Sequence, residues 1–162
     1  MLFLPLADQS FFVGMKSSLS LYYQRFEFNA GLYYLLRQIG YWYYNYNAIA
    51  LIGKLFFFFA ISLIGLVSYV GFRRKTDELV IYALIYLVFA LFSLILHPWY
   101  ILFLVALAPM LKARYSIVWS FLIFFTYLGY NPQGFTENYW IVGLEYTALL
   151  IAVYLDWKNQ AF

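Results

Sequence analysis

Long apolar stretches separated by short polar connections make up most of the chain. They cover residues 48–72, 79–96, 99–111, 115–130 and 139–155. A helix needs about 20 apolar residues to cross a bilayer, within a range of roughly 17–25. The pattern therefore predicts about five membrane-spanning helices. The stretch 99–111 is the shortest, and it crosses only if Lys112 and Arg114 extend their charged ends beyond it.

Cations occupy alternate connections between these stretches. They form three groups, which are Arg73, Arg74 and Lys75, then Lys112 and Arg114, and finally Lys158. Because cytoplasmic loops are enriched in Lys and Arg, a single topology places all of them in the cytoplasm together with the carboxyl terminus. The same topology places His97, the loop 131–138 and the segment before residue 48 on the outer face.

The segment 7–47 is too polar to span a membrane and too aromatic for a solvated loop. Its rings are Tyr22, Tyr23, Phe26, Phe28, Tyr33, Tyr34, Tyr41, Trp42, Tyr43, Tyr44 and Tyr46. Amphipathic rings concentrate at headgroup depth, so we expect one or two interfacial or re-entrant helices on the outer face. One is expected at residues 30–39, with Asn29 as its N-cap and Gly40 just beyond its end.

Composition places the chain among integral membrane proteins. Of 162 residues, 66% are hydrophobic and only 10% are charged, whereas soluble domains carry about 25% charged residues. The net charge of +3 includes no basic block of the kind that binds nucleic acid. The absence of cysteine and the single histidine exclude disulfides and thiolate or histidine-rich metal sites. We expect one all-α membrane domain over residues 1–162, with no cofactor assigned and with the requirement for a divalent cation left open.

The only histidine interrupts the apolar tract between residues 79 and 111, in the string His97-Pro98-Trp99-Tyr100. A bilayer tolerates such a break only where protein or water surrounds it. In one interpretation, His97 binds a phosphate or a sugar hydroxyl, or carries a proton. In the other, it is a polar helix end in headgroup water, with Pro98 starting the next helix.

Arg25, Glu27 and Asn29 alternate with Phe26 and Phe28. In an extended stretch, this spacing places the polar groups on one face and the rings on the other. A cavity-facing polar side and a lipid-facing ring side suit a lipid-linked, phosphate-bearing substrate. Alternatively, Arg25 pairs with Glu27 at the interface and Asn29 caps a helix.

Lys54 and Glu145 are charged residues within predicted spans. Lys54 either extends to the headgroups or turns inward, where it neutralises a phosphate or pairs with Glu145. Asp8 and Glu137 are expected to be solvent-exposed loop carboxylates. No nucleophile elbow, phosphate-binding glycine loop or acidic metal cluster is present in the sequence.

Three parts of the sequence resemble bacterial polyprenol-dependent mannosyltransferases of the Bacteroidetes type, which are C-type (GT-C) membrane glycosyltransferases. They are residues 19–37, with the core Phe26-Glu27-Phe28-Asn29-Ala30, the string His97-Pro98-Trp99-Tyr100, and Leu144-Glu145-Tyr146. The resemblance implies inverting transfer of a sugar, mannose, from a polyprenyl-phosphate donor to a glycan or glycolipid acceptor on the outer face of the bacterial inner membrane.

The family's catalytic carboxylate lies in an early, aspartate-rich outer loop, which this sequence lacks. We therefore expect a carboxyl-terminal portion of such an enzyme, inactive alone, with its catalytic residue unknown. The resemblance implies phosphate contacts from the cations, sugar contacts from Glu27 and Asn29, and a donor or acceptor contact from His97. The expected substrate-binding set is Arg25, Glu27, Asn29, Arg37, Lys54, His97, Trp99 and Tyr100.

Two other classes remain open. A transporter or channel subunit would line a polar path with His97, Lys54 and Glu145, and a non-catalytic scaffold would need no such cluster. The predicted polar groups concentrate toward the outer side rather than along the full depth of the spans, which favours the transferase over a transporter.

Overall fold

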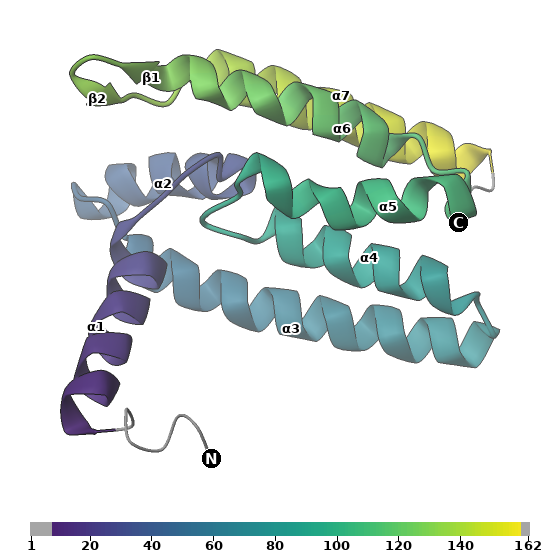
Figure 1. The fold of residues 1–162 in the computed structure, drawn as a ribbon, viewed down its shortest axis with the longest axis horizontal. Helices are drawn as coiled ribbons and strands as arrows, with labels where there is room; N and C mark the ends of the chain where they lie inside the picture. The colour runs from purple at the N-terminus through teal and green to yellow at the C-terminus, as the bar shows by residue number, and fades with distance from the viewer. Residues whose placement is uncertain (1–7, 160–162) are drawn as a thin grey trace.

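The computed structural model describes residues 8–159, without the side chains of residues 19–25, and shows a mostly helical chain (Figure 1). The α-helices are α1 (Gln9–Arg25), α2 (Gly31–Tyr44), α3 (Ile49–Arg74), α4 (Glu78–Leu91), α5 (Leu102–Leu111), α6 (Tyr115–Leu122) and α7 (Tyr139–Lys158). The 3₁₀ helix η2 (Pro98–Ile101) leads into α5, and η3 (Ile123–Gly129) extends α6. Strands β1 (Tyr130–Asn131) and β2 (Gly134–Phe135) form a hairpin at the predicted turn.

Helices α3 to α7 run back and forth, and each packs on the next along the chain (Figure 1). The α3–α4 and α5–α6 connections and the carboxyl end of α7 lie at one end of this array (Figure 1). Helix α2 and the β1–β2 hairpin lie at the opposite end, where α1 projects away from the array (Figure 1). The fold thus gathers the three groups of cations at one end, as the proposed topology requires.

Two of the described helices, α3 and α7, are long and apolar enough to cross a membrane, with 26 and 20 residues respectively. Helix α3 leaves most of its apolar side chains uncovered, and Phe57, Phe58 and Phe59 are 59–66% exposed. A helix in the core of a soluble protein would bury such side chains, and soluble monomers do not carry so large an apolar surface.

The other predicted spans form shorter helices. Helix α4 has 14 residues, and the apolar helical segments Pro98–Leu111 and Tyr115–Gly129 fall in the same 10–17-residue class. At about 1.5 Å per residue, a helix of that length falls short of a hydrocarbon core of roughly 30 Å. By length and composition alone, two of the described helices are long enough to span a membrane.

Helix α4 ends at Leu91, although the apolar pattern predicts a span continuing to residue 96. Residue 95 instead forms a parallel bridge with Phe28. The Phe28 N–H donates to the Leu94 carbonyl at 3.0 Å, and the Leu96 N–H donates to the Phe28 carbonyl at 2.9 Å. These hydrogen bonds satisfy buried backbone groups, and they replace the helical hydrogen bonds that residues 94–96 do not make.

The segment 7–47 contains two helices, α1 and α2, within the described residues, in agreement with the prediction. Helix α2 is longer than expected. Its N-cap is Ala30, without a side-chain cap bond, so the prediction of Asn29 as N-cap is wrong. Gly40 lies inside the helix, buried next to Ala48, and Asn45 ends the helix in a left-handed conformation with φ 58°.

Candidate functional site

Residues 27–29, in the connection between α1 and α2, contact Arg37, His97 and Glu145. Glu27 forms an ion pair with Arg37 of α2. The Phe28 ring lies 4.7 Å from the His97 ring, between centroids. The Asn29 side chain donates to Glu145 of α7. Glu27, Asn29, Arg37 and His97 thus lie around one short segment.

The rings beside these polar groups do not share a lipid-facing side. Phe28 is completely buried, whereas Phe26 is 46% exposed. The expectation that both rings face lipid is therefore wrong for Phe28, because its backbone pairing with residues 94–96 draws the ring into the core. The side chain of Arg25 lies outside the described residues.

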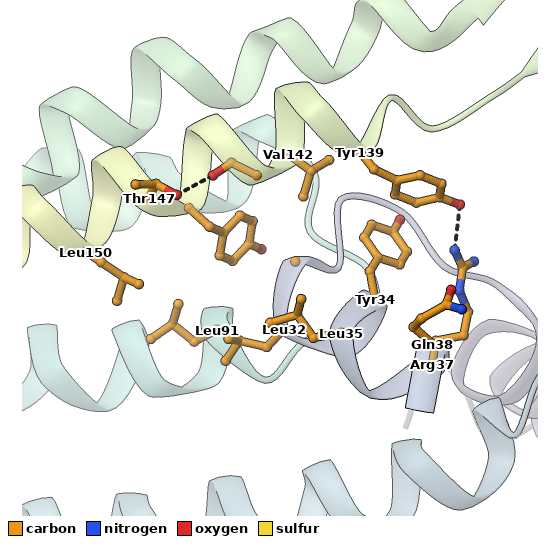
Figure 2. Close-up of a pocket in the computed structure, with 13 residues that line it drawn as sticks. Leu32, Tyr34, Leu35, Arg37, Gln38, Leu91, Tyr139, Val142, Thr147 and Leu150 are labelled. Atoms are coloured by element: carbon orange, nitrogen blue, oxygen red, sulfur yellow. Dashed lines mark hydrogen bonds between the residues drawn. The ribbon is translucent and has the colours of Figure 1, made fainter. Parts of the chain in front are cut away.

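Arg37 holds α2 and α7 together at one end of a pocket. Its Nη1 pairs with Glu27, and its Nη2 donates to the Tyr139 hydroxyl at 2.5 Å (Figure 2). The guanidinium carbon also lies 4.9 Å from the centre of the Tyr34 ring and 5.2 Å from that of Tyr139. Glu27 therefore has Arg37 as its partner, and the guanidinium is packed between two rings.

The pocket lies between α2 and α7 and has a volume of about 410 Å³ (Figure 2). Its polar end carries Tyr34, Arg37, Gln38 and Tyr139. Apolar side chains make up the rest, chiefly Leu32, Leu35, Leu91, Val142 and Leu150. Thr147 donates its hydroxyl back to the Gly143 carbonyl at 2.7 Å. Such a pocket suits an amphipathic ligand with an anionic head and an apolar tail.

Glu137 is a site residue that the sequence reasoning missed. It was expected to be solvent-exposed, but it is only partly exposed and accepts two hydrogen bonds. The Tyr34 hydroxyl donates to its Oε2 at 2.5 Å, and the Asn29 N–H donates to the same oxygen at 3.0 Å. Burial and the bond to Glu137 raise the pKa of Tyr34 well above its usual value, so this phenol remains a neutral donor. No local sequence signal links Glu137 to partners so distant in the chain.

Glu145 is a buried carboxylate, with 1% of its surface exposed. It accepts hydrogen bonds from Asn29 Nδ2 at 3.0 and 3.2 Å and from Trp119 Nε1 at 2.7 Å. The hypothesis that it pairs with Lys54 is wrong, because Lys54 is exposed on α3 and no described ion pair includes it. The Tyr146 hydroxyl donates to the Asn29 carbonyl at 2.8 Å. Two neighbouring side chains of α7, Glu145 and Tyr146, therefore hold Asn29 in place.

His97 is part of an aromatic stack outside the pocket. Its ring is nearly parallel to that of Trp99, at 4.3 Å and 9°, and meets Tyr100 edge-on at 5.7 Å. Burial lowers the pKa of His97 below its ordinary 6.5, which leaves the imidazole neutral near pH 7. A neutral imidazole suits contact with a hydroxyl better than pairing with a phosphate. His97 Nδ1 is buried without a hydrogen-bond partner among the described residues.

Comparisons with protein-family models, with curated proteins and with solved structures found no match to this chain. Within residues 8–159, no group of three or more side chains is arranged to hold a metal ion. The chemistry of the described part of the site therefore consists of one guanidinium, several tyrosine hydroxyls and the carboxylates of Glu27, Glu137 and Glu145.

Proposed function

We propose that this chain is the donor-binding portion of a GT-C membrane glycosyltransferase. Its donor is a polyprenyl-phosphate-linked sugar, mannose, and its acceptor is a glycan or glycolipid. The observation that carries the proposal is a cavity with apolar walls and the guanidinium of Arg37 at its polar end. The resemblance of residues 19–37 and of His97-Pro98-Trp99-Tyr100 to that family points to the same chemistry.

The polar end offers hydrogen-bond donors for the phosphodiester that joins the polyprenyl chain to the sugar. A guanidinium has five N–H donors in a planar fork, and among the described residues Arg37 donates from Nη1 to Glu27 and from Nη2 to Tyr139. Remaining N–H groups are left for phosphate oxygens, with the Tyr139 hydroxyl beside them. The prenyl chain then lies along Leu91 and Leu150. A catalytic carboxylate is not assigned in this chain.

The proposed setting is the bacterial inner membrane, crossed by five segments, with the pocket on the outer side and the carboxyl terminus in the cytoplasm. The gathering of the cationic connections at the end opposite α2 and the hairpin supports this orientation (Figure 1). Non-helical backbone at membrane depth is tolerated where protein buries it. The buried, paired residues 94–96 meet this condition, so the short α4 is compatible with a crossing segment.

Binding of undecaprenyl phosphate to the full chain in lipid nanodiscs tests the proposal, with phosphatidylglycerol as the competing anionic lipid. Native mass spectrometry of the nanodiscs measures occupancy. We expect undecaprenyl phosphate to be preferred, and Arg37→Ala to weaken its binding about tenfold through loss of a charge-assisted contact. Arg73→Ala removes a cation at the opposite end and should leave binding unchanged.

A second variant keeps the test valid if Arg37→Ala unfolds. Gly143→Leu places a side chain into the pocket, where a Cβ on residue 143 has nothing within 4 Å, and it should reduce binding while Arg37 remains intact. Equal binding of undecaprenyl phosphate and phosphatidylglycerol by the wild-type chain would overturn the proposal. Unchanged preference in both folded pocket variants would do the same.

A further inference from the structure

We propose that the exposed face of Trp99 is a stacking platform for a pyranose ring of the acceptor. The inference rests on the proposed function for the identity of the acceptor, but it names a second subsite, separate from the pocket at Arg37. The residues that form it come from the loop before η2 and from the first turn of η2.

Trp99 is held rigidly by the rings behind it. One face of its indole lies parallel to His97 at 4.3 Å. His97 in turn packs against Phe28 at 4.7 Å, and Phe28 packs against Phe135 of the hairpin at 4.8 Å. Phe28 is fully buried, so the stack is anchored in the core, whereas Trp99 is 53% exposed at its outer end. The indole therefore presents one covered face and one open face.

The backbone around Trp99 is fixed as well. Pro98 follows His97 at the start of η2, and the Tyr100 N–H donates to the His97 carbonyl at 2.9 Å. The Tyr86 hydroxyl donates to the Tyr100 carbonyl at 2.7 Å and ties η2 to α4. A ring fixed in this way loses little conformational freedom on binding, which favours a weak ligand such as a sugar.

A pyranose matches this surface chemically. The C–H groups on one face of the sugar carry partial positive charge, and the face of an aromatic ring carries partial negative charge. The imidazole beneath the indole is a neutral hydrogen-bonding group rather than a cation, so nothing in the stack requires an anionic ligand. A phosphate has no C–H face to stack on Trp99, and in the proposed function it binds at Arg37 instead.

Saturation-transfer NMR on the full chain in nanodiscs tests the platform, with methyl α-mannoside as the probe. Irradiation of the aromatic protons should transfer saturation to the ring C–H protons of the sugar. Trp99→Ala should reduce that transfer roughly threefold to tenfold, as expected for loss of one stacked ring, and Trp99→Phe should restore part of it. Trp140→Ala is the matched control, because Trp140 is 91% exposed in the first turn of α7.

Transfer that persists unchanged in Trp99→Ala would overturn the platform, and so would equal losses in Trp99→Ala and Trp140→Ala. Undecaprenyl phosphate binding, measured on the same samples, separates the two proposals. Sugar contact at Trp99 without binding of undecaprenyl phosphate would support the stacking platform and refute the proposed glycosyltransferase function. Binding of undecaprenyl phosphate without sugar contact at Trp99 would support the proposed function and refute the stacking platform.

Discussion

Asn29 donates hydrogen bonds to two carboxylates. Its backbone N–H donates to Glu137, and its side-chain amide donates to Glu145. Its φ of 48° is in the left-handed region, which asparagine adopts more readily than most residues. The sequence identified Asn29 as a polar site residue, but the N-cap role predicted for it is wrong. An N-cap follows from local pattern, whereas a bond to a residue more than 100 positions away does not.

His97 should make the stability of the protein depend on pH. Its folded-state pKa lies below the ordinary 6.5 because burial penalises the charged imidazole. Between pH 6.5 and the folded-state pKa of His97, the unfolded chain binds more protons than the folded chain. The free energy of unfolding therefore keeps its full value above pH 6.5 and decreases as the pH falls through this range. We expect the apparent Tm in detergent to fall less between pH 7.5 and 5.5 in His97→Gln than in the wild-type chain.

Asp8→Asn is the control for this pH experiment, because it removes an exposed carboxylate that caps α1 and takes no part in the His97 stack, so it should keep the wild-type slope above pH 5.5. The role of His97 burial is refuted if His97→Gln and the wild-type chain show the same slope.

At the scale of elements, the apolar pattern predicted the ranges of α3 and α7 closely. It did not predict where α4 ends, because that depends on pairing with a residue distant in the sequence. The stretch 48–72 corresponds closely to α3 (Ile49–Arg74), and 139–155 to α7 (Tyr139–Lys158). Residues 92–96 are equally apolar, yet they leave the helix. Residues 94–96 are stabilised outside the helix by their backbone pairing with Phe28, and hydrophobicity alone does not distinguish a helix from a buried strand.

The different burial of Phe28 and Phe26 predicts unequal effects of removing the two rings. Phe28→Ala removes a fully buried ring that packs on His97 and Phe135, so we expect it to destabilise the fold by about 3–5 kcal/mol. Phe26→Ala, two positions earlier, removes a half-exposed ring and should cost less than about 1 kcal/mol. Unfolding in detergent, followed by circular dichroism, measures both. Similar losses in the two variants would show that the buried Phe28 ring does not stabilise this region.

At the scale of the whole molecule, the charge pattern and the fold agree on which connections share an end, although each rests on different information. The alternation of cations predicted the grouping from sequence, and the back-and-forth packing of α3 to α7 reproduces it (Figure 1). The pocket between α2 and α7 could not be predicted in this way. It depends on how residues 27–29 bring α2 against α7, and those contacts are set by side chains distant in sequence.

The orientation can be tested directly because the sequence contains no cysteine. Gln133→Cys introduces a thiol in the β1–β2 turn, and Thr76→Cys introduces one in the α3–α4 connection. If the cationic end is cytoplasmic, a membrane-impermeant maleimide added to intact spheroplasts should label Gln133→Cys and should reach Thr76→Cys only after permeabilisation. Asn159→Cys, just beyond α7, should behave like Thr76→Cys, because both lie at the cationic end. Labelling of Thr76→Cys before permeabilisation, with Gln133→Cys protected, would invert the topology and place the pocket of Arg37 on the cytoplasmic side, where an outer-face lipid donor cannot reach it.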